Sequence, residues 1–244
     1  MRKSGRGDDH AAFHCLTGGG EAGELMRALD WSRTAVGRVE DWPQSLRTVI
    51  SIVLESKFPM YVAWGDDYTQ FYNDGYRPIL GSTKHPAAMG GRACDTFAES
   101  WHIIGPMFDG VMAGDAVGSE DWMLPLDRHG YLEECFFTFS YSPIRAEDGL
   151  VGGVHVTVTE TTARVLHERR LRTLRDLAAH ASTTLEEEAA WQGALEVLDR
   201  NPADAAFAVA FPRDADRVTT AVGAANPRLR DVDAWPLELS LIHI

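Results

Sequence analysis

The chain has 244 residues, of which 45% are hydrophobic and 24% are charged. This composition is that of an ordinary globular protein, and the length suits one or two domains. The formal net charge of −13 disfavours nucleic acid and anionic membrane surfaces as partners, because clustered Lys and Arg side chains are needed to bind phosphate groups.

The cysteines and the apolar runs indicate the cellular compartment. Cys15, Cys94 and Cys135 form no CxxC pair, so neither a zinc site nor a disulfide framework is predicted, and a reducing compartment fits. No apolar run approaches the ~18 residues that span a bilayer. The basic residues near the N-terminus are not followed by the apolar segment of a signal peptide. We therefore expect a cytoplasmic protein.

The N-terminal quarter of the chain divides into an arm and two helices. Residues 1–20 are polar or glycine-rich and are expected to form a disordered arm. Two helices are expected within residues 21–57, where they flank the next domain. The second opens near Pro43, which suits a first helical turn, and Asp41 is predicted to cap it.

Residues 58–159 are predicted to form one domain. Two strands are expected first, at Phe58–Trp64 and Tyr68–Tyr72. Asn73 then suits the N-cap of a short helix. Gly81 suits the end of that helix, because glycine adopts left-handed backbone geometry without strain.

A longer helix and three strands complete this domain. The apolar spacing predicts the helix over Trp101–Met112. Strands are predicted over Asp121–Leu126 and Tyr131–Tyr141, and the period-two alternation of Val154–Val158 predicts a third. On the middle strand, one face carries Cys135, Phe137, Phe139 and Tyr141.

The remaining chain switches back to helix. Residues 160–182 are predicted to form a linker helix, and Thr184 with Glu187 matches a capping box that opens a further helix. Strand signals resume near Ala206. A helix and a hairpin cannot bury a core by themselves, so a domain that continues beyond residue 238 is expected.

The last six residues, LSLIHI at 239–244, can be encoded by CTG TCT CTT ATA CAC ATC. Those bases resemble a transposon-end adapter that is used in sequencing libraries. We therefore expect an adapter-derived tail and a C-terminally truncated chain. An ordinary apolar tail is the alternative, and different bases in the nucleotide sequence would exclude the adapter.

The element order, together with YNDGY at 72–76 and ILG at 79–81, resembles a PAS domain over about residues 45–165. The resemblance implies an α+β fold: a five-stranded antiparallel sheet with helices on one face, enclosing a small cavity. It also implies signalling through the exit helix. Asn73, Tyr76 and Gly81 would be structural residues of this motif. Thr157 stands where many PAS domains carry an Asp before the exit helix, so the usual salt bridge is not implied at that position.

Residues 183–238 resemble the start of a GAF domain. WPQSLRT, FPMYVAWG, FTFSYSPIR and TVTETTARV in this order resemble bacterial cytoplasmic PAS–GAF sensor histidine kinases. The resemblance implies a sensory input fragment that forms a homodimer through its exit helix. The full-length parent would phosphorylate itself on a downstream His and pass the phosphate to a response regulator.

Two other functions remain open. The same input could belong to a phosphatase or to a cyclic-dinucleotide enzyme, or the PAS domain could be a ligand-free dimerisation module. The fragment itself is not expected to be an enzyme, because it has no GxSxG or phosphate-loop motif, and the glycine run at residues 18–20 is interpreted only as a flexible segment. His180 lacks the acidic residue and the Pro that come after a phosphoacceptor His, which favours a solvent-facing linker residue.

Large side chains that are expected to face inward are the candidates for a ligand pocket. They are Tyr72, Cys94, Trp101, Phe137, Phe139 and Tyr141. Solid core packing, in which these side chains fill the cavity themselves, is the alternative.

Flavin and haem are considered as cofactors and disfavoured. Cys94 occupies the place of the flavin-bonding Cys of light-sensing PAS relatives, but Ala93 and Asp95 replace its usual Asn and Arg neighbours. An acidic residue beside a flavin phosphate is unfavourable, so a small buried Cys is favoured. Haem would need His102 or His129, which are more simply surface residues. The sequence contains no HExxH motif, so a metal site is not predicted.

Overall fold

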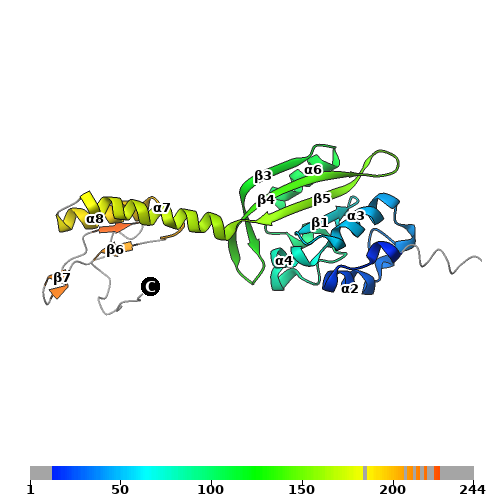
Figure 1. The fold of residues 1–244 in the computed structure, drawn as a ribbon, viewed down its shortest axis with the longest axis horizontal. Coiled ribbons are helices and arrows are strands. Elements are labelled where there is room, and N and C mark those ends of the chain that lie inside the picture. Colours follow the sequence, from blue (N-terminus) through cyan, green and yellow to red (C-terminus); the bar gives the residue numbers. More distant parts are fainter. Residues whose placement is uncertain are drawn as a thin grey trace, which may run out of the picture. The chain divides into compact units, whose positions relative to one another are not determined.

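The computed structural model describes residues 13–183, 186–205, 208–210, 213–214, 217–218 and 223–225. The chain forms two compact units, residues 1–162 and 163–244, and Figure 1 shows the elements of each. None of the helices in the described ranges combines the length and the hydropathy that crossing a bilayer requires. Thr184 and the C-terminal residues 239–244 lie outside the described residues.

The first unit is built on one antiparallel sheet of five strands, in the order β2-β1-β5-β4-β3. The strands are β1 (Met60–Trp64), β2 (Thr69–Tyr72), β3 (Val117–Asp127), β4 (Leu132–Arg145) and β5 (Val151–Glu160). The last strand lies beside the first, with Tyr61 opposite Val156. The predicted α+β class with a PAS-like sheet is confirmed.

The connection between β2 and β3 covers one face of the sheet, which we call the inner face. It contains the 3-10 helix η4 (Asp74–Tyr76), then α4 (Arg77–Lys84), α5 (Ala93–Thr96) and α6 (Trp101–Met112). The predicted cap is confirmed: the side-chain oxygen of Asn73 accepts the N–H of Tyr76 at 3.1 Å. The same oxygen accepts the N–H of Met60 at 3.1 Å, so the buried side-chain amide of Asn73 joins the start of this connection to β1.

The N-terminal helices pack on the opposite face of β1 and β2. They are η1 (Phe13–Leu16), α2 (Gly20–Ala28), η2 (Trp31–Arg33), η3 (Val39–Asp41) and α3 (Gln44–Glu55). Successive strand residues point to opposite faces, so Phe71 turns away from the face of Tyr72. Its ring stacks on Trp31 at 4.7 Å and meets Trp42 edge-on at 5.3 Å between centroids.

Two expectations for the N-terminal quarter need correction. The disordered arm was predicted over residues 1–20, but it does not reach residue 20, because Leu16 is fully buried and α2 begins at Gly20. The prediction that Asp41 caps α3 is wrong. Asp41 is the last residue of η3, and the side chain of the residue at the N-cap of α3 makes no capping hydrogen bond. A carboxylate from the β4–β5 turn replaces it: Glu147 accepts the N–H of Ser45 at 2.6 Å.

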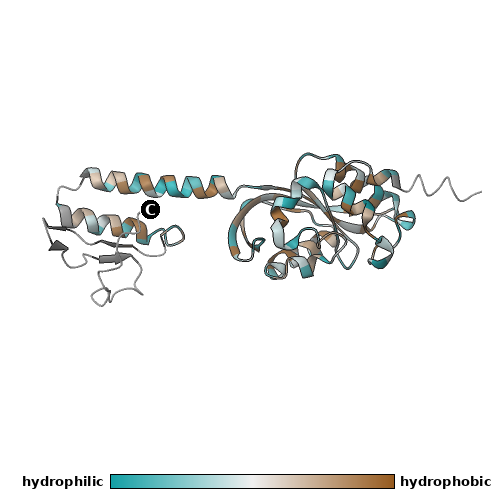
Figure 2. Cartoon of the chain, turned by 90° about the horizontal axis from the view of Figure 1, so that it is seen from below, coloured by the Kyte–Doolittle hydropathy of each residue, from teal (hydrophilic) through white to brown (hydrophobic). Residues whose placement is uncertain are grey.

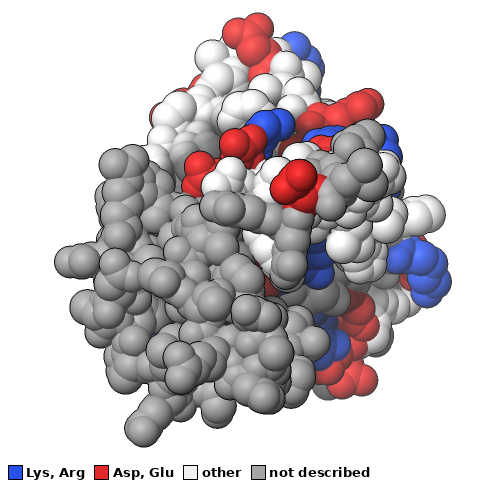
Figure 3. All heavy atoms as spheres, turned by 90° about the vertical axis from the view of Figure 1, so that its left-hand side faces the viewer, with Lys and Arg blue, Asp and Glu red and all other residues white. Residues whose placement is uncertain are grey.

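The second unit contains α7 (Thr162–Thr183) and α8 (Glu187–Asp199). Two short strand pairs accompany them, β6 (Ala208–Ala210) with β9 (Gly223–Ala225) and β7 (Arg213–Asp214) with β8 (Arg217–Val218). Figure 2 shows apolar residues interspersed with polar ones along α7. Leu171 and Leu174 are 64% and 61% exposed. Figure 3 shows acidic and basic side chains interspersed on the described part of the face it views.

Candidate functional site

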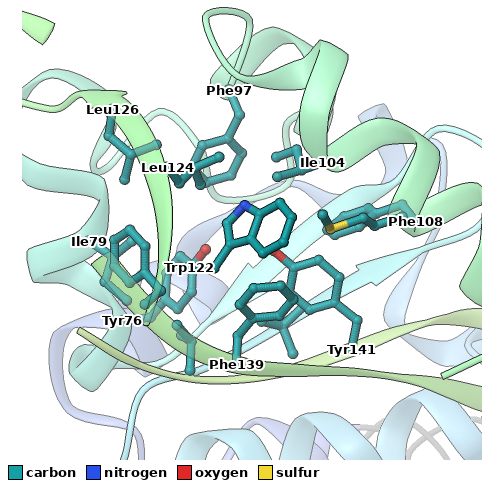
Figure 4. A pocket seen from close by; sticks show the side chains of 14 residues that line it. Tyr76, Ile79, Phe97, Ile104, Phe108, Trp122, Leu124, Leu126, Phe139 and Tyr141 are labelled. Carbon is teal, nitrogen blue, oxygen red and sulfur yellow. The ribbon is translucent and has the colours of Figure 1, made fainter. Parts of the chain in front are cut away.

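A cavity lies between the inner face of the sheet and helices α4 to α6 (Figure 4). Its free volume is about 40 Å³, whereas one water molecule needs roughly 10–15 Å³ measured in the same way. Fourteen residues line it, and none of them carries a charged side chain. Such a lining suits a small apolar molecule, for which binding sites are concave and mostly hydrophobic.

Three of the six predicted pocket residues line this cavity. Phe137, Phe139 and Tyr141 follow one another on the inner face of β4. Their spacing of two residues places them on one side of the strand, as predicted. Cys135 belongs to the same row and is fully buried, and burial raises the pKa of its thiol to about 11. The thiol is therefore protonated and unreactive at neutral pH.

The other three predicted pocket residues lie outside the lining. Tyr72 is fully buried, and its hydroxyl oxygen lies 2.9 Å from Nδ1 of His85. The ring of Trp101 packs against Phe108, with 5.8 Å between centroids. Cys94 on α5 is half-buried, and its thiol donates to Asp95 at 3.7 Å.

The residues considered for cofactors are not brought to the cavity. Neither Cys94 nor His102 nor His129 is among its lining residues, and both histidine side chains are exposed. Within the described part of the chain, no three His, Cys, Asp or Glu side chains gather as they would around a metal ion. His180 is not a freely exposed linker residue as predicted, because its ring packs over Gly193 on α8.

The motif residues have two different roles. Asn73 is 1% exposed and makes four hydrogen bonds: its amide nitrogen donates to the carbonyls of Ser56 and Phe58, beside the two N–H groups that its oxygen accepts. Gly81 has a φ of 62°, and any Cβ there would overlap the backbone of Arg128. Tyr76, predicted as structural, also lines the cavity.

Three buried tyrosines bring unused hydroxyl groups to this region. Tyr61, Tyr76 and Tyr141 are 1%, 7% and 8% exposed. No hydrogen-bond partner for these hydroxyls occurs among the described residues. Burial raises the pKa of each phenol well above its ordinary value. The hydroxyls therefore stay neutral and can donate a hydrogen bond.

Trp122 was not predicted as a pocket residue, yet Figure 4 shows its indole in the middle of the lining side chains. Its position depends on a β-bulge, because the register of β3 with β4 shifts between Ser119 and Trp122. Asp121 has a left-handed φ of 50° at this shift. An extra residue in one strand exchanges the two faces beyond it, so the bulge turns Trp122 towards the inner face.

An ion pair joins the edge of the cavity to the start of α7. The guanidinium of Arg128 donates two hydrogen bonds of 2.8 Å to the carboxylate of Glu160. The hydroxyl of Thr162 donates to the same carboxylate at 2.9 Å. Burial by itself would raise the pKa of Glu160, but these hydrogen bonds outweigh burial and hold the pKa below its ordinary value. The acidic residue that forms an ion pair before α7 is therefore Glu160, three residues after Thr157.

No protein-family model matches the chain. Among solved structures, the chain is similar to a sensory box sensor histidine kinase from Vibrio cholerae, with 18% identity and a TM-score of 0.33 over 47% of this chain and 91% of that one. It is also similar to an RNA-binding light-oxygen-voltage receptor, with 15% identity and a TM-score of 0.38 over 72% of this chain and 65% of that one.

Proposed function

We propose that this chain is a sensory input fragment of a two-component sensor histidine kinase, in which a PAS domain senses a small ligand or a partner. The observation that carries the proposal is that the cavity and the start of α7 share a strand pair. Phe137 lines the cavity and lies opposite Glu160 in the register of β4 and β5. Its neighbour Phe136 donates its N–H to the hydroxyl of Thr162, the first residue of α7, at 2.9 Å.

The ion pair gives this connection a second route. Leu126 lines the cavity and precedes Arg128 by two residues. A ligand that displaces Leu126 or Phe137 therefore acts on one partner of the Arg128–Glu160 pair. Such a ligand shifts the population of two arrangements at the start of α7 only as far as it binds one of them better. A tenfold preference corresponds to about 1.4 kcal/mol.

The output of this module is a change in α7 and in the segments downstream of it. The exposed Leu171 and Leu174 provide an apolar surface through which two exit helices pair in a homodimer. Residues 183–238 begin a GAF domain in this proposal. A downstream region then phosphorylates its own His and transfers the phosphate to a response regulator. The same input would serve a phosphatase or a cyclic-dinucleotide enzyme equally well.

A ligand-free dimerisation module is the second candidate function. The small free volume of the cavity, about 40 Å³, favours it, since side chains of the protein already fill most of the space. The exposed Leu171 and Leu174 also favour it. In this case the cavity would accept no ligand, and α7 would only join two chains.

A chimeric kinase separates these functions. The chain is fused through α7 to the catalytic region of a histidine kinase, and autophosphorylation is measured for Glu160→Gln and for the surface variant Glu168→Gln. Glu160→Gln should change the rate several-fold, because it weakens the ion pair before α7, whereas Glu168→Gln should not. Equal rates for the wild type and for folded Glu160→Gln would refute the sensory role.

A further inference from the structure

The cavity combines an apolar wall with two unused hydrogen-bond donors. Tyr76 and Tyr141 both line it, and each is more than nine-tenths buried. Figure 4 shows both hydroxyl oxygens pointing into the cavity near Trp122. Neither hydroxyl has a hydrogen-bond partner among the residues that the structure describes. Because both hydroxyl groups open onto the cavity, an acceptor atom bound there can accept a hydrogen bond from each.

A third tyrosine reinforces this donor character. The ring of Tyr61 lies 5.0 Å from the ring of Tyr76, and its hydroxyl is likewise buried without a partner. Burial is the main reason that the pKa of Tyr61 is raised, and a negative charge on Tyr76 or Tyr141 would raise it further. All three phenols are therefore neutral, and those of Tyr76 and Tyr141 line the cavity.

We propose that this cavity binds a small neutral ring compound that carries one hydrogen-bond acceptor, held by the hydroxyls of Tyr76 and Tyr141. This proposal specifies the class of ligand for the sensory function proposed above. The role of the ligand as a signal rests on that function, whereas its binding does not. A charged ligand is excluded because the lining provides no counter-charge. A ring is favoured because Phe97, Phe108 and Phe139 line the wall, and aromatic faces pack well on one another.

The indole of Trp122 sets the size of this ligand. The free volume of about 40 Å³ has room for only about three water molecules, so a bicyclic ring compound must take the place of the indole. Trp122 is suited to leave, since 42% of its surface is exposed and it comes directly after the bulge at Asp121. The ligand is accordingly about as large as a bicyclic ring.

Calorimetric titration of the 244-residue chain with 1-indanone and with indane tests the proposal, because the two probes differ by one carbonyl acceptor. The double variant Tyr76→Phe/Tyr141→Phe should bind 1-indanone about tenfold more weakly and indane with unchanged affinity. Tyr131→Phe, at an exposed tyrosine outside the cavity, is the matched control. The anion indane-1-carboxylate should not bind.

A second variant, Trp122→Ala, tests ligand binding even if the indole prevents ligands from entering the wild-type cavity. This variant should bind 1-indanone more tightly than the wild type, because no indole must be displaced. Absence of binding to both proteins, or equal weakening of both probes in the tyrosine double variant, would overturn the proposed ligand class. A chimeric kinase that still responds to Glu160→Gln would then leave the sensory role standing. Tight binding without any effect on that kinase would refute the sensory role alone.

Discussion

Arg128 holds Glu160 through two parallel hydrogen bonds of 2.8 Å, and so joins the β3–β4 turn to the residue that ends β5. The two side chains are only 11% and 27% exposed. A charge-assisted pair that is shielded from water contributes more to stability than a pair on the surface. This contact is therefore a point where stability and the proposed relay coincide.

Glu160→Gln should lower the free energy of unfolding by about 2 kcal/mol, because a hydrogen bond to a charged group is worth ~1.5–3 kcal/mol. Urea denaturation measures the loss. Glu168→Gln is the matched control: Glu168 pairs with Arg164 at 3.0 Å, but both side chains are more than half exposed. That change should cost less than about 0.5 kcal/mol. Equal losses in the two variants would contradict a special role for the Arg128–Glu160 pair.

Tyr61→Phe should leave the protein as stable or make it more stable, by up to about 1 kcal/mol, because it removes a buried hydroxyl that has no partner. Tyr72→Phe provides the comparison. The hydroxyl of Tyr72 lies 2.9 Å from Nδ1 of His85, so its loss should cost about 1 kcal/mol. Thermal unfolding of both variants measures the difference, and a larger loss at Tyr61 would show that its hydroxyl has a partner.

Gly81→Ala should be severely destabilising. The residue has a φ of 62°, and an added Cβ would lie 2.6 Å from the Cβ of Arg128 as well as overlapping its backbone carbonyl. Gly65→Ala is the control, since its φ is 70° but no atom lies within 4 Å of the added Cβ. The control should therefore lose only the backbone strain, about 1–2 kcal/mol, and chemical denaturation should separate the two.

His155 should make stability depend on pH below neutrality. Burial lowers the pKa of its imidazole from 6.5, and its Nε2 has no partner among the described residues. The unfolded chain therefore binds the proton more strongly than the folded one. The stabilisation is fully present above pH 6.5 and is lost as the pH falls through the lower pKa of the folded state.

Unfolding by urea at pH 7.5 and pH 5.0 tests this dependence. His155→Val should reduce the difference between the two pH values, whereas His129→Val, at an exposed histidine, should not. Glu99 and Glu160 contribute at lower pH, because their pKa values lie below 4.5 in the folded state. An unchanged pH difference in His155→Val would rule out the histidine as its source.

Local sequence patterns predicted the elements of the first unit well. The helix Trp101–Met112 has the predicted ends, and the period-two row of β4 placed Phe137, Phe139 and Tyr141 on one face. Asn73 was predicted as a cap from its residue type, and the N–H group that it accepts belongs to a residue only three positions further along the chain. Such features depend on neighbours along the chain, which a sequence displays directly.

The features that escaped prediction depend on residues far apart. Glu147 caps α3 from a distance of 102 residues along the chain, and no local pattern reveals such a partner. Trp122 faces inward only because of the bulge in β3. The sequence indicates this bulge only weakly, through Asp121, a residue type that tolerates left-handed backbone geometry. The ion pair of Arg128 with Glu160 was not predicted, because its two residues are 32 positions apart along the chain.

The stacking of Phe71 on Trp31 and Trp42 sets the shortest piece of this chain that is suitable for expression. A fragment that begins just before β1 would lack Trp31 and Trp42 and would expose the ring of Phe71 on the sheet. Exposed apolar surface of this kind promotes aggregation during purification. Laboratory fragments of the first unit should consequently start upstream of Phe13, even though the sheet itself begins only at Met60.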